Sequence, residues 1–230
     1  MKNRILLIIS VLLLVLWFWQ VKPDGKTKVV FCDVGQGDGA IIIKNNFQMM
    51  IDAGPKNTKM AECLSRYVPF WDKEIEVFIA SHGDADHIGG LENIKKSYKI
   101  EREFNNLNLE IGEIIRYGVI DFEILSNSEQ SIMGILKYGG KKYLFTGDAS
   151  VESEYVVQEK IDVLKVGHHG SDTSTGEDLL DRVRPKLAVI SVGRNNRYSH
   201  PREIVVNRLV DRGIEIKRTD LEGDIIINGF

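Results

Sequence analysis

The sequence of 230 residues predicts an α/β fold in which sheets are covered by helices. Short apolar runs crowd the first half of the chain, and apolar runs alternate with helix-like segments in the second half. The chain is 43% hydrophobic and long enough to bury one large core. Its formal net charge of −3 argues against a broad basic face for nucleic acid, but is compatible with a local basic groove.

The first half is expected to be rich in strands. Its apolar segments are bounded by turn-forming residues, among them a glycine-rich turn over 34–39 and an Asn45-Asn46 hairpin. The run Ala53-Gly54-Pro55 ends the third strand. The strands expected here are residues 28–33, 40–44, 47–52 and 75–80, and the helices are residues 58–67 and 91–98.

Residues 99–130 show no clear period and predict only two short strands, near 113–117 and 119–125. Beyond them strands and helices alternate, and Pro201 suits the first turn of a helix. The further strands are expected at 132–137, 142–146, 162–166, 187–192, 214–218 and 224–227. The further helices are expected from residue 151 onward, over 176–183 and over 201–212.

The N-terminal segment predicts a membrane-directed leader. It is basic as far as Arg4 and then runs for 17 residues without a charge. That length is at the short limit of a spanning helix, and Trp17 and Trp19 suit a membrane interface. We expect residues 1–21 to be an uncleaved signal-anchor in preference to a cleaved signal peptide, followed by a linker over 22–27 and one domain over 28–230.

The two cysteines, Cys32 and Cys63, show no metal-type spacing. Small thiols commonly fill protein cores, so buried free thiols are favoured over a disulfide. A disulfide becomes permissible if the domain is exported.

Residues 81–90, Ser-His-Gly-Asp-Ala-Asp-His-Ile-Gly-Gly, form the densest group of ligand-type side chains. They follow the strand predicted over 75–80 and contain two histidines and two aspartates within six positions. Carboxylates packed this closely repel one another unless cations lie between them, so the segment predicts a site for two metal ions. The alternative is a polar turn in which Asp86 caps a helix and His82 lies on the surface.

The remaining histidines, His168, His169 and His200, also follow closely on predicted strands. Asp148 lies just past a strand end too, in the sequence Phe-Thr-Gly-Asp. Loops at strand ends collect the active sites of layered α/β folds. These residues are therefore expected to gather at the same site.

The motifs resemble those of the metallo-β-lactamase fold. Residues 82–87, His-x-Asp-x-Asp-His, are similar to the family's His-x-His-x-Asp-His signature with Asp84 in place of the middle histidine, and Thr-Gly-Asp148 resembles its bridging aspartate. More narrowly, residues 28–230 resemble the C-terminal hydrolase domain of the ComEC-type competence DNA-uptake proteins. The segments that carry this likeness are residues 31–38, 81–90, 144–148, 164–171, 196–201 and 218–220.

The resemblance implies a four-layer αββα sandwich with a binuclear site at one sheet edge. It implies that His82 and Asp84 bind one metal, that Asp86 and His87 bind the other, and that Asp148 bridges them.

It further implies that either His168 or His169 completes the ligand shell. We expect only one of them to ligate, because neighbours on an extended chain point to opposite sides. His200 is the other candidate for that ligand, or a proton donor to the leaving group.

The histidine that serves the wider family as third ligand of the first metal is missing, since no histidine lies between His87 and His168. The uptake-type domains that Ser128-x-x-Ser131 resembles lack it as well. The site is therefore richer in oxygen ligands, which favours manganese or magnesium over zinc, with zinc still acceptable.

Two such ions suit phosphodiester cleavage, because they activate water near neutral pH and stabilise charge on both reacting oxygens. Asp86 or the bridging carboxylate is expected to orient the water. Cationic candidates for holding phosphates are Lys165, Arg194 and Arg197, and candidates for lining the substrate site are Gln36, Asp38 and Ser171. The alternatives are that the two arginines are ordinary solvated charges and that the glycine turn with Gln36 and Asp38 is purely structural.

The favoured hypothesis is a membrane-anchored or secreted, metal-dependent nuclease or phosphodiesterase that acts on DNA outside the cytoplasm. The second hypothesis is a hydrolase of the same fold for another ester, amide or small phosphodiester. The third is a non-catalytic DNA-binding module of an uptake or secretion assembly. With at most one span, the chain cannot itself form a channel, and would act with a separate channel protein or in a scavenging role.

Overall fold

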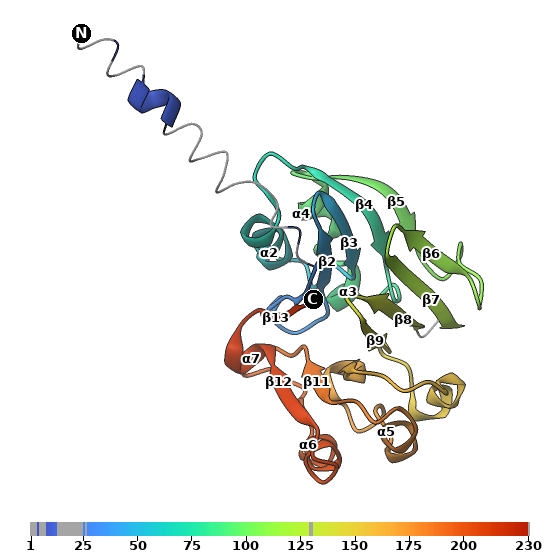
Figure 1. The fold of residues 1–230 in the computed structure, drawn as a ribbon. Helices are drawn as coiled ribbons and strands as arrows, with labels where there is room; N and C mark the ends of the chain where they lie inside the picture. Colours follow the sequence, from blue (N-terminus) through green and yellow to red (C-terminus); the bar gives the residue numbers. More distant parts are fainter. Residues whose placement is uncertain (1–3, 5–7, 13–24, 26, 129–130, 230) are drawn as a thin grey trace.

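The computed structural model describes residues 4, 8–12, 25, 27–128 and 131–229, and two facing sheets dominate it (Figure 1). Most of the predicted leader lies outside the described residues, and residues 8–12 are helical. Within the described part of the chain, no helix combines the length and the apolarity that crossing a membrane requires.

The first sheet has six strands, and its order places the C-terminal strand beside the N-terminal one. β1, β2 and β3 pair antiparallel, whereas β3, β4 and β5 run parallel. The strands, in sheet order, are β13 (Ile225–Asn228), β1 (Thr27–Phe31), β2 (Ala40–Lys44), β3 (Phe47–Ile51), β4 (Glu74–Ile79) and β5 (Lys99–Phe104). The helices of this half are α2 (Lys59–Tyr67), α3 (Ala85–Ile88) and α4 (Leu91–Lys95).

The second sheet has seven strands, antiparallel from β6 to β9 and parallel from β9 to β12. They are, in sheet order, β12 (Glu215–Arg218), β11 (Leu187–Ile190), β10 (Val163–Lys165), β9 (Lys141–Phe145), β8 (Ile132–Tyr138), β7 (Ile120–Asn127) and β6 (Ile114–Tyr117). The helical segments of this half are η1 (Val151–Val156), η2 (Gly167–Gly170), α5 (Glu177–Val183), α6 (Glu203–Val210) and α7 (Thr219–Glu222).

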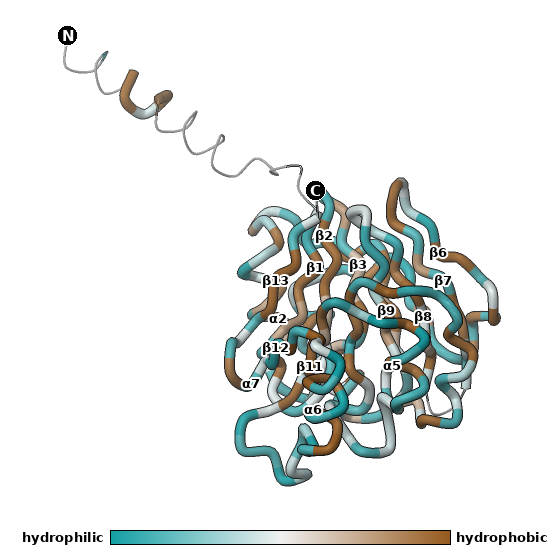
Figure 2. Tube along the Cα trace, turned by 60° about the horizontal axis from the view of Figure 1, so that its bottom comes forward, coloured by the Kyte–Doolittle hydropathy of each residue, from teal (hydrophilic) through white to brown (hydrophobic). Residues whose placement is uncertain are grey.

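The core is divided into three layers of apolar contacts. One cluster, with Phe31, Phe122 and Phe145, lies between the sheets. A second packs α2 on the outer face of the first sheet, and a third packs α5 and α6 on the outer face of the second. Figure 2 shows the apolar segments following the strands and the hydrophilic ones following the peripheral loops. Since full burial of one such side chain contributes about 1.5–3 kcal/mol, these layers stabilise the four-layer αββα arrangement that the family resemblance implies.

Most predicted strands are confirmed within a residue or two, but the strand β5 and the short helical segments α3, η2 and α7 were not predicted. β5, Lys99–Phe104, is an edge strand whose side chains are mostly exposed and charged, so it shows no apolar alternation. The helix predicted from residue 201 begins at Glu203, and the segment from residue 151 is a short 3₁₀ helix.

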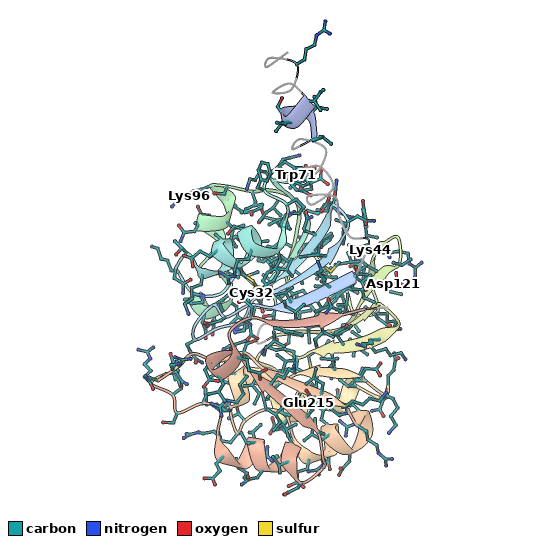
Figure 3. The ribbon with its side chains drawn as sticks, turned by 60° about the vertical axis from the view of Figure 1, so that its left-hand side comes forward. Cys32, Lys44, Trp71, Lys96, Asp121 and Glu215 are labelled. Carbon is teal, nitrogen blue, oxygen red and sulfur yellow. A yellow bond between two sulfur atoms is a disulfide. The ribbon has the colours of Figure 1, made fainter. Side chains whose placement is uncertain are left out.

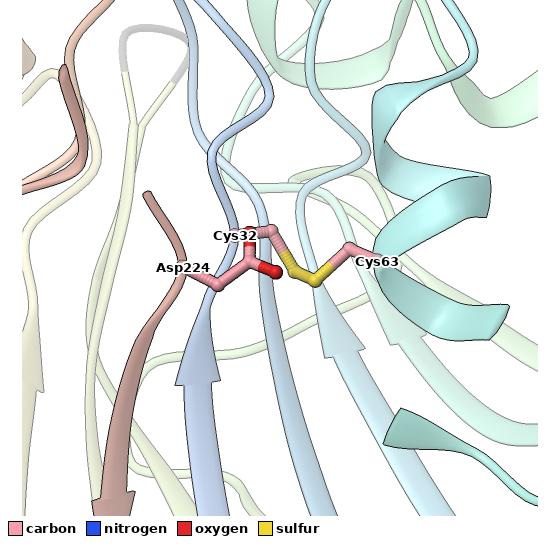
Figure 4. Close-up of side chains that lie close together, drawn as sticks. All are labelled: Cys32, Cys63 and Asp224. Atoms are coloured by element: carbon pink, nitrogen blue, oxygen red, sulfur yellow. A yellow bond between two sulfur atoms is a disulfide. The ribbon is translucent and has the colours of Figure 1, made fainter. Parts of the chain in front are cut away.

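The expectation of free thiols is wrong, because a disulfide joins Cys32 to Cys63 (Figure 4). Cys32 ends β1 on the outer face of the first sheet, and α2 packs Cys63 onto that same face. Their Cα atoms are 6.0 Å apart, within the range that a disulfide spans. Asp224 lies beside the pair and binds the guanidinium of Arg66, which tethers the start of the last strand to α2.

Candidate metal centre

Five chain segments converge at one edge of the sandwich. The parallel strands β4, β9, β10 and β11 all end there, and the β1–β2 turn joins them. Because side chains on loops at the carboxyl ends of parallel strands meet at one sheet edge, the topology explains why ligand-type residues far apart in sequence gather here.

Three ligand atoms face one another without hydrogen-bond partners. The Nε2 atom of His82 lies 3.8 Å from Asp148 Oδ2, and the Nε2 atom of His87 lies 3.4 Å from Asp148 Oδ1. Both Nε2 atoms and Asp148 Oδ1 are buried and make no hydrogen bond. Buried polar atoms are normally paired, so three orphans in one place fit a cation that they would share. The two carboxylate oxygens of Asp148 face different imidazoles, as a bridging ligand requires.

The other ring nitrogens of these histidines are held by residues that sequence reasoning missed. Asp52 Oδ2 lies 2.9 Å from His87 Nδ1, and Ser81 Oγ lies 3.0 Å from His82 Nδ1. The backbone N–H and hydroxyl of Ser81 in turn donate to Asp52. Such contacts orient ligating imidazoles and direct Nε2 toward the metal. Asp52 is the last residue of a predicted strand, and Asp148 lies just past the end of another, and that position was the available signal.

Asp84 and Asp86 take different positions around this cluster. The carboxylate of Asp84 lies 3.7 Å from His82 Nε2 and its side chain is 77% exposed. Asp86 is half-buried, in the first turn of α3, and its Oδ2 lies 3.3 Å from His169 Nε2. The residue that precedes α3 is Asp84, with no side-chain capping bond, so the polar-turn alternative with Asp86 as the cap is not what forms.

His168 and His169 both face the cluster, because the chain is not extended there. Both residues have left-handed backbones, with φ of 47° and 53°, so their side chains do not alternate. His168 Nε2 lies 3.5 Å from Asp148 Oδ2, while His169 Nε2 faces Asp86. The premise of an extended chain is therefore wrong, and which of the two histidines ligates stays a prediction. His200 lies behind His168, with ring centroids 5.9 Å apart.

Besides Asp38, Asp52 and His87, two further sets of ligand-type groups share His87. One set is His82, His87 and Asp148, and the other is Asp86, His87 and His169. In each set one ligand atom per residue lies within 4.8 Å of the others. Asp52 holds His87 Nδ1, so His87 offers only Nε2, but the five residues of the two sets together supply enough ligand atoms for a pair of cations.

Lys165 is not placed to hold a phosphate, because it is buried behind the cluster. Its Nζ lies 2.8 Å from Asp38 Oδ1 and its side chain is only 4% exposed. The same carboxylate oxygen lies 3.1 Å from His169 Nδ1. Lys165 and Asp38 therefore form a buried ion pair behind His169, whose Nδ1 also lies 3.0 Å from the carbonyl oxygen of Ser191, so the carboxylate and this carbonyl orient the ring together.

The remaining predicted substrate residues lie around the rim. Gln36 Oε1 accepts a bond from the N–H of Gly193 and ties the β1–β2 turn to the loop after β11. Ser171 is buried and its hydroxyl contacts Thr173. The exposed arginines are Arg194, which donates to the carbonyl of Asp220, and Arg197, which lies over the ring of Tyr198.

Charges in the cluster shift one another's pKa values strongly. Burial lowers the pKa of His87, but Asp52 and Asp148 outweigh it, so that this pKa ends well above its ordinary value. Burial likewise disfavours the charged form of Asp148, but His87 and His169 lower its pKa to about 2. The pKa of His169 rises to about 9 because Asp38 and Asp86 offset its burial. The carboxylates thus favour positive charge in the cluster, and protons bound to the histidines provide that charge when no metal is bound.

Comparison with known proteins agrees with this geometry. The model of the metallo-beta-lactamase superfamily matches residues 32–103 and 128–194. The chain belongs to this superfamily. Among solved structures, the metallo-beta-lactamase fold protein YhfI of Bacillus subtilis superposes with a TM-score of 0.65 at 11% identity, covering 88% of this chain and 100% of that one. A diphosphatase of the PhnP family superposes at 0.56 with 14% identity, covering 88% and 98%. Both likenesses concern the fold.

The curated relatives include competence proteins, as the ComEC resemblance predicts. Recombination protein 2 of Haemophilus influenzae is 34% identical over 224 residues, which are 86% of this chain and 28% of that protein. ComE operon protein 3 of Bacillus subtilis is 29% identical over 89% of this chain and 33% of its own length. Competence protein ComA of Neisseria gonorrhoeae is 30% identical over 87% and 32%. The chain thus spans about a third of the length of these relatives.

Proposed function

We propose that this superfamily hydrolase is a divalent-metal-dependent nuclease or phosphodiesterase that cleaves DNA outside the cytoplasm. The observation that carries the proposal is the convergence of orphaned ligand atoms on the two oxygens of Asp148. A binding module would have no need for buried, unpaired imidazole nitrogens, whose desolvation costs stability.

The proposed ligands divide around Asp148. His82 and His168 lie toward Oδ2 and Asp84 lies beside His82, and these three would hold one ion. His87 lies toward Oδ1, and with Asp86 and His169 it would hold the second ion. When bound, such a pair of ions generates hydroxide near neutral pH and stabilises charge on the attacking and leaving oxygens.

The chain's own residues do the rest of the proposed work. Asp86 is half-buried, and although burial opposes the shift, its bond to His169 lowers its pKa, so that it stays ionised and can orient the attacking water. His200 has a buried Nδ1 without a hydrogen-bond partner and adjoins His168, a position suited to protonating the leaving oxygen. Asp52, Ser81 and Asp38 hold the imidazoles in place from behind.

The donor set bears on which metal is expected. Three carboxylates face the site, which suits manganese, and four imidazoles face it as well, which suits zinc. Magnesium binds imidazole poorly, so manganese is our first choice and zinc the second.

The rim loop after β11 supports DNA as the substrate. Tyr198 is exposed and stacks on His200 with ring centroids 5.9 Å apart, and the guanidinium of Arg197 lies 4.8 Å from the Tyr198 ring centre. Exposed aromatic and guanidinium groups beside a catalytic centre suit the bases and phosphates of a single strand. The names of the relatives, which refer to competence and recombination, agree with a DNA substrate.

The proposed location rests on two features. A disulfide between Cys32 and Cys63 persists in oxidising compartments, and residues 5–19 are continuously free of charge. We therefore propose residues 1–21 as a signal-anchor or signal peptide, 22–27 as a linker and 28–230 as an extracytoplasmic hydrolase domain. Cooperation with a separate channel protein is part of this proposal.

A cleavage assay tests the proposal directly. The full chain is incubated with end-labelled single- and double-stranded DNA and manganese, magnesium or zinc, beside Asp86→Asn and the control Asp211→Asn. Asp211 is an exposed aspartate at the end of α6. We expect manganese-dependent cleavage, reduced at least about 100-fold by Asp86→Asn and unchanged by Asp211→Asn.

Absence of DNA cleavage with every metal would refute the nuclease. Turnover of a small chromogenic phosphodiester alone would point to the second hypothesis, a small-substrate hydrolase. DNA binding with neither activity would point to the non-catalytic module.

A further inference from the structure

The sheet edge opposite the metal centre carries exposed aromatic side chains. Strand register defines this edge, because Thr27 pairs with Lys44, Lys44 pairs with Phe47, and β4 runs parallel to β3. Phe70 and Trp71 lie in the loop that leads into β4, with 59% and 42% of their surfaces exposed. Their rings pack edge to face with centroids 5.1 Å apart.

The second sheet extends this exposed surface. The β6–β7 turn carries Tyr117, whose ring stacks on Phe47 with centroids 3.8 Å apart, and Val119, which is exposed. We call Phe70, Trp71, Tyr117 and Val119 the aromatic edge. Aromatic side chains with one apolar and one polar side prefer the headgroup level of a lipid bilayer.

Lysines lie beside the aromatic edge. A shallow depression next to Val119 is lined by four of them, Lys44, Lys137, Lys141 and Lys142. Two are paired with acids, since Lys137 binds Glu123 and Lys142 binds Glu159. Lysine stems beside aromatic rings suit the surface of a membrane that contains anionic lipid.

The chain enters the domain at this same edge. The uncharged run of residues 5–19 reaches Thr27, the first residue of β1, through the seven residues 20–26. Even fully extended, that connection spans at most about 29 Å. A bilayer that holds residues 5–19 therefore lies close to the edge that bears Phe70 and Trp71. Figure 3 labels Trp71 at the top of the domain and Lys44 lower on its right-hand side.

The competing apolar surface lies at the metal edge. Leu107 and Ile111 are exposed in the loop after β5, whose last carbonyl, that of Phe104, accepts a bond from Ala80 in the loop before the metal ligands. Both are aliphatic. For this edge to meet the bilayer, the connection to Thr27 would have to double back along the whole of β1, and the membrane would then cover the metal centre.

We propose that the aromatic edge docks on the headgroup region of a lipid bilayer, so that the metal centre faces away from the membrane. The occupant of this surface is lipid, and the orientation leaves the ligand cluster open to a macromolecular substrate. The proposal rests on the membrane anchorage proposed for residues 1–21 and holds whatever the hydrolase cleaves.

Tryptophan fluorescence tests this orientation, because the chain has three tryptophans and only Trp71 lies in the domain. The full chain with W17F and W19F, in vesicles of phosphatidylethanolamine and phosphatidylglycerol, carries Trp71 as its single probe. A matched control adds W71F and L221W, which moves the probe to α7 at the metal edge, where Leu221 is 67% exposed. Flotation of the vesicles confirms that each variant is membrane-bound.

We expect a nitroxide placed near the headgroups to roughly halve the Trp71 emission and to leave the Leu221→Trp probe unchanged. Aqueous acrylamide should quench the two probes in the opposite order. Equal lipid quenching of both probes, or quenching of the Leu221→Trp probe alone, would overturn the proposal. So would absence of lipid quenching at Trp71, or failure of the chain to float with the vesicles.

Discussion

Replacement of Asp38 by asparagine tests whether the buried ion pair behind the metal centre organises the site. Asp38 Oδ1 lies 2.8 Å from Lys165 Nζ and 3.1 Å from His169 Nδ1, and both partners are buried. Asp38→Asn removes the negative charge and leaves the Lys165 ammonium buried beside neutral acceptors only, the new amide oxygen and the carbonyl of Val166.

The magnitude follows from the geometry. At 2.8 Å and an effective dielectric constant of about 20, the attraction between the two charges is about 6 kcal/mol. Part of it offsets the desolvation of the pair, and removal of one partner of a buried pair typically costs about 3–5 kcal/mol. Lys165→Met should cost less, because His169 still accompanies Asp38. The double variant should therefore be more stable than additivity predicts, by roughly 2 kcal/mol.

Denaturant unfolding of the four proteins measures these free energies, with Glu103→Gln as the control. Glu103 pairs with Lys95 on the surface, where its loss should cost less than about 1 kcal/mol. Manganese titration of the folded variants should show affinity about 10–100-fold weaker in Asp38→Asn, because His169 loses its orienting carboxylate. An Asp38→Asn protein as stable as Glu103→Gln, with wild-type metal affinity, would refute this reasoning.

Two further predictions concern stability. Burial raises the pKa of Glu154 from 4.5 to about 7, against the opposing effect of the Gly176 and Thr175 N–H groups that it accepts. Because folding raises this pKa, the contribution of Glu154 to stability is present below pH 4.5 and is lost as the pH rises through 7. In denaturant unfolding, the free energy of unfolding of wild type should therefore fall by about 3 kcal/mol more than that of Glu154→Gln between pH 4.5 and 8. Parallel pH profiles of the two proteins would contradict this. The double replacement of Cys32 and Cys63 by serine should lower the free energy of unfolding by about 4 kcal/mol, since the bond closes a loop with a separation of 31 residues. Dithiothreitol should then destabilise wild type alone, and an equal response of both proteins would count against the bond.

Local sequence signals predicted much of the fold. The apolar runs of β1 to β4 and of β8 to β11 are strands because their side chains are buried on one or both faces, which leaves a readable pattern. The strand β5 was not predicted because an exposed edge strand needs no apolar pattern. The compact cluster from His82 to His87 was also readable, since one turn of chain holds all four side chains near one another.

The sequence by itself determined the layered fold and the chemical type of the site, because apolar periodicity and a dense run of ligand residues are local properties. Tertiary structure alone decided which side chains contact and orient the candidate metal ligands. Asp52 contacts His87, which is 35 residues away in the sequence, and Asp86 contacts His169, which is 83 residues away. Strand order and register bring these residues together, and no local sequence pattern encodes them. The left-handed backbone at His168 and His169, the burial of Lys165 and the pairing of Cys32 with Cys63 likewise depend on how distant segments pack.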